Sequence, residues 1–205
     1  MIKFKHRFIA IIVSVLLLFS LTVNAKSAKT EPQALVESVA TEMLERIKKD
    51  QELIKNEPAH INKLVNELVI PHFDFHKMSR WVLAKYWRKA NATQKKQFVE
   101  EFKTLLVRTY ATSLSEYIDQ EIKYLPFRGK IASGDVTVRS EIEQAGSFPI
   151  PINYRLHNND GDWKVYDITI DDISLVANYR SSFAKHIRKS GIDDLISTLA
   201  QKSKK

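Results

Sequence analysis

The stretch DWKVYDITIDDISLVANYRSSF, residues 162–183, begins with the period of a strand and ends with the period of a helix. In its first half bulky residues alternate with polar ones, so Tyr166, Ile168 and Ile170 are expected on one face of a strand. The junction between the two halves therefore determines how a sheet meets the helices of this chain.

The second half of the stretch carries large apolar side chains every four residues, at Leu175, Tyr179 and Phe183. This spacing predicts a helix that begins near Ser174. A strand that leads directly into an aromatic helix can close a filled core. It can equally form two walls of a cavity, because both elements present apolar side chains to one interior. The residues alone leave both interpretations open.

The preceding segment, residues 31–120, has helical spacing. Pro58 and Pro71 interrupt the spacing, so they separate successive helices. Asp74 and Thr93 are the predicted N-caps of the next two helices. The longest helix has an apolar face made of Phe98, Phe102, Leu105, Leu106, Tyr110, Leu114 and Tyr117.

Residues 121–171 switch to a period of two and are predicted to form a sheet. Four strands are expected, near residues 122–128, 134–143, 149–157 and 162–171. Glycines separate them, and HNNDGDW is typical of a tight hairpin. A last helical segment, residues 174–200, follows. This order predicts an α+β fold in which helices wrap a curved, largely antiparallel four-stranded sheet.

The first 25 residues have the pattern of a secretory signal. Basic residues precede the apolar run FIAIIVSVLLLFSLTV, and the small-residue pattern VNA ends at Ala25. The apolar run is shorter than the roughly 20 residues that a membrane span requires. We therefore expect cleavage after Ala25, export to the periplasm and a single mature domain over residues 26–205.

The composition narrows the class of protein further. The chain has no cysteine, which excludes disulfides, thiolate metal sites, cysteine catalysis and a lipid anchor at the cleavage site. The formal charge is +8, of which the signal segment contributes three positive charges. A mild basic excess on an exported chain favours anionic lipid over nucleic acid as a partner, although it is also compatible with ordinary solubility charge.

Catalytic patterns are weak. His72, Asp74 and His76 have the spacing of zinc ligands, but they lie at a helix start where Asp74 is the expected cap. No serine lies in a Gly-x-Ser-x-Gly elbow. Carboxylates lie on or near the predicted strands, and one of them in the mouth of a curved sheet could serve an isomerase-like enzyme. These carboxylates are Asp135, Glu141, Asp167 and Asp171.

Four blocks together resemble the MlaC family, also called toluene-tolerance auxiliary proteins. They are MSRWVLAKYWRKANATQKKQFVEEFKTLLVRTYATSL (78–114), GDVTVRSEI (134–142), PIPINYRL (149–156) and WKVYDITIDDISLVANYRSSFAKHIRKSGIDDLI (163–196). The likeness covers nearly all of the predicted mature chain, with the blocks in the same order and at the same spacing. One departure is Asp172, where the family pattern leads us to expect a glycine in the turn before SLV.

The resemblance implies a sheet of the nuclear-transport-factor-2 type wrapped by helices, with a deep apolar pocket for acyl chains. It implies a soluble periplasmic phospholipid carrier that maintains the lipid asymmetry of the outer membrane. The implied partners are phospholipid, an inner-membrane ABC transporter complex through its MlaD ring, and the outer-membrane MlaA–porin complex. The resemblance implies no nucleic acid, cofactor, metal or covalent chemistry, and we expect a monomer that is not an enzyme.

If the pocket exists, its expected lining comes from the strand–helix stretch and from the long helix opposite. The predicted lipid-binding residues are Leu106, Tyr110, Leu114, Tyr117, Tyr154, Tyr166, Ile168, Ile170, Val176, Tyr179 and Phe183. Arg139 and Arg155 are the predicted neighbours of the headgroup, because each alternates with apolar residues along a strand. A chaperone or adaptor for lipoproteins or a partner protein, and an isomerase-like enzyme, are the alternative functions.

Overall fold

The computed structural model describes residues 31–114, 119–144 and 146–202. The predicted signal segment and Tyr117 lie outside the described residues. Helices precede the sheet, as the periodicity predicts. They are α1 (Glu31–Lys49), α2 (Gln51–Asn56), α3 (His60–Leu68), α4 (Phe75–Leu83) and α5 (Ala92–Leu114). Two helices follow the sheet, α6 (Leu175–Ser190) and α7 (Ile192–Lys202).

The sheet is open and antiparallel throughout, with its strands in sequence order. Its strands are β1 (Ile122–Tyr124), β2 (Asp135–Ile142), β3 (Ile150–Asn159), β4 (Asp162–Ile170) and β5 (Ile173–Ser174). The predicted α+β class is confirmed, but the predicted number of four strands is wrong. β5 was not predicted because two residues are too few for a period-two pattern. β1 is shorter than predicted because Pro126 has no N–H to donate to a neighbouring strand.

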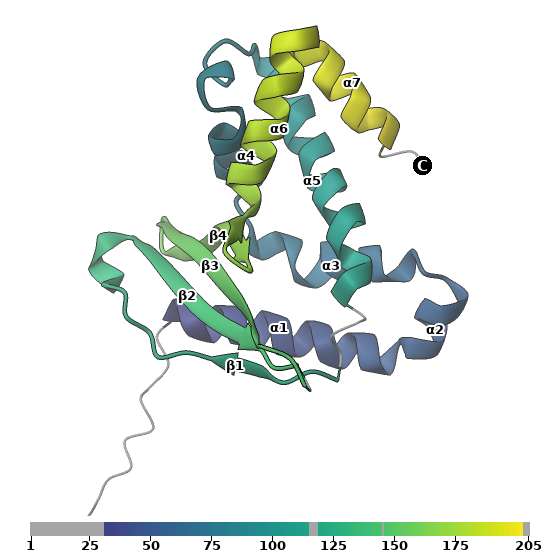
Figure 1. Ribbon diagram of the computed structural model, residues 1–205, viewed down its shortest axis with the longest axis vertical. Helices are drawn as coiled ribbons and strands as arrows, with labels where there is room; N and C mark the ends of the chain where they lie inside the picture. The colour runs from purple at the N-terminus through teal and green to yellow at the C-terminus, as the bar shows by residue number, and fades with distance from the viewer. Residues whose placement is uncertain (1–30, 115–118, 145, 203–205) are drawn as a thin grey trace, which may run out of the picture.

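Helices pack on the sheet at two places (Figure 1). α1 lies along one face, where its Val36 joins a buried cluster with residues of β2, β3 and β4. α4, α5, α6 and α7 form a bundle that stands above the sheet, and α5 runs from the top of this bundle down to α3. Among the described residues, none of the helices is long and apolar enough to cross a membrane.

The helix caps test the sequence predictions directly. The side chain of Asp74 accepts a hydrogen bond from the Lys77 N–H at 2.7 Å, so Asp74 caps α4 as predicted. The predicted Thr93 cap of α5 is wrong. Asn91 and Gln94 instead form a reciprocal capping box, in which each side-chain oxygen accepts from the backbone N–H of the other residue.

The turn between β4 and β5 explains the departure at Asp172. Asp171 and Asp172 both adopt positive φ, at 47° and 61°. A two-residue hairpin turn with two left-handed positions favours glycine, asparagine or aspartate. Asp172 therefore keeps the turn without the expected glycine, because its short side chain tolerates the left-handed backbone better than most residues do.

Ala84 has an unfavourable backbone conformation for a residue other than glycine, with φ 46° and ψ −114° at the C-terminus of α4. These angles belong to the first central position of a type II′ turn, which glycine dominates. We expect Ala84→Gly to stabilise the protein by about 1 kcal/mol, because relief of the strain exceeds the added entropy of the unfolded chain. Urea denaturation measures this gain.

The matched control makes the same chemical change inside a regular helix. Ala184 lies in the middle of α6, where a glycine is expected to cost about 1 kcal/mol. The two variants should therefore shift the denaturation midpoint in opposite directions. A loss of stability in Ala84→Gly would show that the backbone at this position is not strained.

Candidate functional site

The buried apolar side chains form three separate clusters. The bundle cluster joins α4, α5, α6 and α7, with Phe98, Phe102 and Phe183 among its members. The α3 cluster joins α1, α3 and α5, and the sheet cluster joins α1 to β2, β3 and β4. Ile70 packs against the first two clusters and Phe73 against the bundle and sheet clusters. The three clusters therefore meet around the segment between α3 and α4.

The predicted lipid-binding residues are divided among these clusters. Leu106, Tyr166, Val176 and Phe183 are buried inside the bundle cluster. Five others are half-buried and pack against the edge of a cluster: Tyr110 and Tyr179 against the bundle cluster, Leu114 against the α3 cluster, and Tyr154 and Ile168 against the sheet cluster. Ile170 is half-buried and belongs to no cluster.

Tyr166 does not share a face with Ile168 and Ile170, so that prediction is wrong. Leu156 pairs with Val165 and Arg155 pairs with Asp167, which leaves Tyr166 as the extra residue of a β-bulge. The bulge turns the Tyr166 ring away from the sheet cluster and into the bundle cluster. The alternation of bulky and polar residues does not reveal a bulge, because the extra residue depends on the partner strand.

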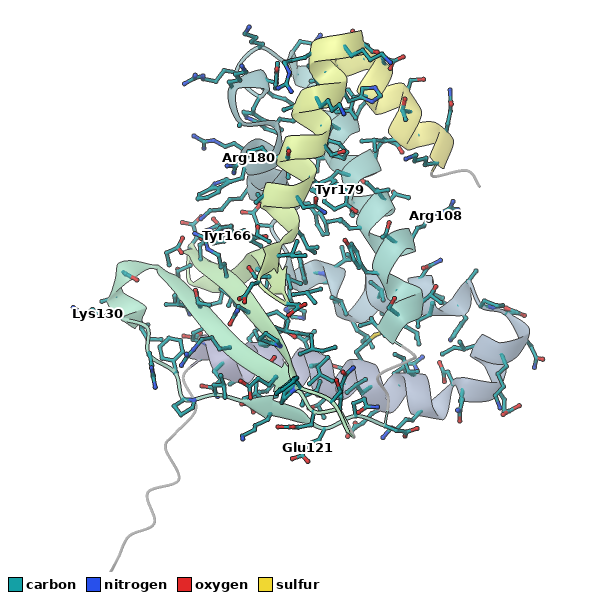
Figure 2. All side chains as sticks on the ribbon, viewed as in Figure 1. Arg108, Glu121, Lys130, Tyr166, Tyr179 and Arg180 are labelled. Carbon is teal, nitrogen blue, oxygen red and sulfur yellow. The ribbon has the colours of Figure 1, made fainter. Side chains whose placement is uncertain are left out.

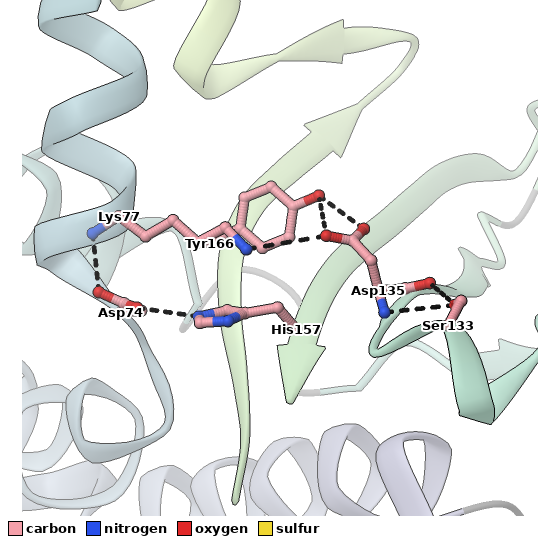
Figure 3. A network of polar contacts seen from close by, with 6 residues as sticks. All are labelled: Asp74, Lys77, Ser133, Asp135, His157 and Tyr166. Carbon is pink, nitrogen blue, oxygen red and sulfur yellow. Dashed lines mark hydrogen bonds and ion pairs between the residues drawn. The ribbon is translucent and has the colours of Figure 1, made fainter. Parts of the chain in front are cut away.

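The buried ring of Tyr166 lies inside a polar network that ties the sheet to α4 (Figure 3). Its hydroxyl donates to Asp135 at 2.8 Å, and the ammonium of Lys77 lies 4.2 Å from the centre of its ring. Asp74, besides capping α4, pairs with His157 at 2.8 Å. Burial, reinforced by the hydrogen bond to Asp135, raises the pKa of Tyr166 to about 12. The network thus keeps a neutral tyrosine between charged groups and has a structural role.

The metal interpretation of His72, Asp74 and His76 finds no geometric support. Asp74 is engaged by the α4 cap and by His157, and the ring of His76 packs edge-on against Trp87 at 5.0 Å. Within residues 31–114, 119–144 and 146–202, no three histidine, aspartate or glutamate side chains gather as metal ligands would.

The two predicted headgroup neighbours lie on the face of the sheet opposite to Tyr154. Arg139 pairs with Asn153, and Arg155 pairs with Thr137, whereas Tyr154 pairs with Val138 on the other face. The Arg139 guanidinium donates to the Pro126 carbonyl at 3.0 Å. The Arg155 guanidinium lies over the rings of Trp81 and Tyr166, at 5.3 and 4.9 Å from their centres. The structure therefore brings Arg155 to α4 and leaves Arg139 with the β1 side of the sheet.

The face that carries Tyr154 shows what space the interior leaves. Tyr154 pairs with Ile168, and Ile152 pairs with Ile170, in two neighbouring rows of half-buried apolar side chains. Burial raises the pKa of the Tyr154 hydroxyl, opposed in part by a hydrogen bond to Ser140. These two rows therefore form an apolar surface that other side chains cover only in part.

Helices α5 and α6 carry similar side chains at the bundle cluster. Tyr179 reaches from α6 toward α5 (Figure 2), where its ring contacts Phe102 with centres 5.3 Å apart. Burial, together with the neighbouring Tyr110 hydroxyl, raises the pKa of Tyr179. Both tyrosines are half-buried, so each brings an apolar ring and one polar group to the boundary of the bundle cluster.

Among the described residues, two surface clefts lie away from the predicted lipid-binding residues. A cleft of about 280 Å³ lies between α1 and β1, with Leu44, Ile122 and Tyr124 in its wall. A second cleft, of about 370 Å³, lies at the C-terminal end of α4. Four cations line this second cleft, which sequence reasoning missed because its residues come from separate segments of the chain.

Comparison with known proteins decides the family. The model of the MlaC protein family matches residues 37–201. The chain belongs to the MlaC family. It is 28% identical to the intermembrane phospholipid transport system binding protein MlaC of Haemophilus influenzae. That match covers 85% of this chain and 83% of the relative. The toluene tolerance protein ttg2D of Pseudomonas putida is 30% identical over 84% of this chain and 79% of the relative.

A solved protein of similar fold contains a bound lipid. The phospholipid-binding protein from Ralstonia solanacearum, determined in complex with a phospholipid, superposes with a TM-score of 0.78 at 31% identity. The match covers 85% of this chain and 97% of that chain. The family resemblance noted from the four sequence blocks is thereby confirmed, together with the α+β arrangement.

Proposed function

We propose that this protein is a periplasmic phospholipid carrier that holds acyl chains between the sheet and the helices. The observation that carries the proposal is the structural match to a protein that was solved with a bound phospholipid. The match covers 97% of that protein's chain. The two rows of half-buried apolar side chains that include Tyr154 support the same assignment from this chain's own residues.

The physical requirement for such a carrier is an enclosed apolar interior. Burial of hydrocarbon is worth about 0.8 kcal/mol per methylene group. Two acyl chains of roughly 15 carbons would therefore cost on the order of 24 kcal/mol to expose to water. A shallow groove cannot offset this cost, whereas a cavity between a sheet and facing helices can.

The acyl chains are assigned to the boundaries where the three clusters do not merge. We assign the lining to the half-buried predicted residues, which are Tyr110, Leu114, Tyr154, Ile168, Ile170 and Tyr179. Leu106, Tyr166, Val176 and Phe183 are buried already, so they support this lining from behind. The clusters must move apart to admit two chains, and separate clusters permit this more readily than one continuous core.

The wider role is transfer of lipid between membranes. We propose that the protein exchanges phospholipid with an inner-membrane transporter complex through MlaD and with the outer-membrane MlaA–porin complex, and so maintains lipid asymmetry. The chemistry required is binding and release alone. No covalent step, metal or cofactor is part of the proposal.

Mass spectrometry of an organic extract tests the function. The mature protein is purified from a bacterial periplasm without detergent, and near-stoichiometric diacyl phospholipid is expected. Absence of lipid from protein that is folded by circular dichroism would contradict the carrier function. Recovery of a lipidated protein in place of phospholipid would assign the chain to a chaperone role.

A further inference from the structure

The cleft at the C-terminal end of α4 has an unusual charge. Its lining residues are Arg80, Trp81, Ala84, Lys85, Trp87, Arg88 and Arg180. Four of them are cations and none is an acid. Among the described residues, no carboxylate lies within 4.0 Å of the charged nitrogens of these four cations. The negative end of the α4 dipole amounts to about half a charge and offsets only part of this repulsion.

An exposed tryptophan forms part of the wall of this cleft. Trp81 is 37% exposed, whereas Trp87 and Trp163 are 9% and 4% exposed. The guanidinium groups of Arg155 and Arg180 lie 5.3 and 6.0 Å from the centre of the Trp81 ring. Arg180 also donates from Nε to the Trp81 carbonyl at 2.8 Å, which holds α6 and α4 together at the cleft. One cation of the cleft, Arg180, and the neighbouring Arg155 of β3 are thus positioned at the same aromatic ring.

We propose that this cleft binds the phosphate of an anionic phospholipid headgroup at a membrane surface. Three of its four cations are arginines, whose planar guanidinium groups bind phosphate oxygens in pairs. An exposed tryptophan beside cations is the pattern that lies at the headgroup level of bilayers. The cleft is concave, so it accommodates one protruding group.

A membrane fits these features better than a protein partner does. The centre of a protein interface packs several apolar anchors together. Trp81 has no such partners, because the other large exposed apolar residues lie on different segments: Leu53 on α2, Ile131 before β2, Phe148 before β3 and Ile173 on β5. The cleft shares no residue with the proposed acyl lining, so the two sites can be tested separately.

Vesicle sedimentation tests the proposal. The mature protein is mixed with vesicles of phosphatidylcholine alone or with one third phosphatidylglycerol, at low and at physiological salt. We expect binding that requires phosphatidylglycerol and weakens with salt, and a loss of at least tenfold in Arg80→Gln/Arg88→Gln. The charge-matched control is Lys49→Gln/Lys63→Gln, at two exposed lysines on α1 and α3, which is expected to lose less than threefold.

Tryptophan fluorescence locates the contact. Only Trp81 of the three tryptophans is exposed, so its transfer to the headgroup region should shift the emission to shorter wavelength, and Trp81→Phe should abolish the shift. Inorganic phosphate should compete more strongly than chloride at equal ionic strength, because free phosphate shares the chemistry of the headgroup.

Three results would overturn the proposal. The first is equal binding to both vesicle types, and the second is unchanged binding in the arginine variant. In the third, the wild-type protein does not bind vesicles, and the arginine variant loses affinity for an acidic partner protein. The last result would assign the cleft to protein docking. Phospholipid in the organic extract is measured in parallel, and its presence separates a failed membrane site from a failed carrier function.

Discussion

Leu114→Glu and Ile170→Glu are each expected to reduce the phospholipid that co-purifies with the protein by at least tenfold. Both side chains are half-buried, Leu114 at the end of α5 and Ile170 at the end of β4. An ionised carboxylate beside hydrocarbon costs several kcal/mol of desolvation. Since 1.4 kcal/mol corresponds to a factor of ten in affinity, lipid occupancy should decrease sharply.

The choice of half-buried positions keeps the fold intact. A charge at Val176, which is 2% exposed, would unfold the protein and would not report on lipid. Leu53→Glu is the matched control, because Leu53 is an exposed leucine on α2, away from the proposed lining. Loading is measured by mass spectrometry of the extract and folding by urea denaturation.

The results of these experiments distinguish an error in the assigned lining residues from an error in the proposed carrier function. Full lipid loading in both glutamate variants would show that the acyl chains lie elsewhere in the protein. Equal loss in Leu53→Glu would show that any added charge near these helices disturbs loading. Wild-type protein without lipid would instead contradict the proposed carrier function itself.

The sequence predicted the features that depend on local chemistry. The change from strand to helix occurs at Ser174, whose hydroxyl caps α6 by accepting from the Ala177 N–H at 3.0 Å. Asp74 caps α4, and Asp172 holds a left-handed position. In each case the role depends only on the residue's own backbone conformation or on a backbone N–H three residues later. It could therefore be inferred without knowledge of the fold.

The sequence did not predict the features that depend on distant partners. The bulge at Tyr166 exists because β3 pairs with Val165 and Asp167, and because Asp135 and α4 receive the displaced side chain. The cationic cleft likewise joins Trp81 to Arg180, which is 99 residues away in the chain. Periodicity assigns a residue to a face, but only the three-dimensional pairing shows which residues meet there.

Asp167→Ala is expected to destabilise the protein by about 3 kcal/mol. Asp167 is 3% exposed, and its two oxygens accept from the Ser174 hydroxyl at 2.7 Å and from the Val176 N–H at 3.1 Å. Hydrogen bonds to a charged group are worth about 1.5–3 kcal/mol, and a carboxylate at a helix N-terminus adds a favourable dipole contribution. The carboxylate thus fixes the first turn of α6 to β4.

Ser174→Ala and Asp167→Asn resolve the contributions to this junction. Ser174→Ala removes the cap and one hydrogen bond to Asp167, and is expected to cost about 1 kcal/mol. Asp167→Asn keeps the shape and one acceptor oxygen, so its cost should lie between the other two. Urea denaturation of the three variants and of the double alanine variant gives the coupling energy. A cost of Asp167→Ala no greater than that of Ser174→Ala would show that the carboxylate does not hold the strand to the helix. In that case the packing of Leu175 and Val176, both buried, would have to fix the junction that orients the proposed lipid-binding tyrosine of α6.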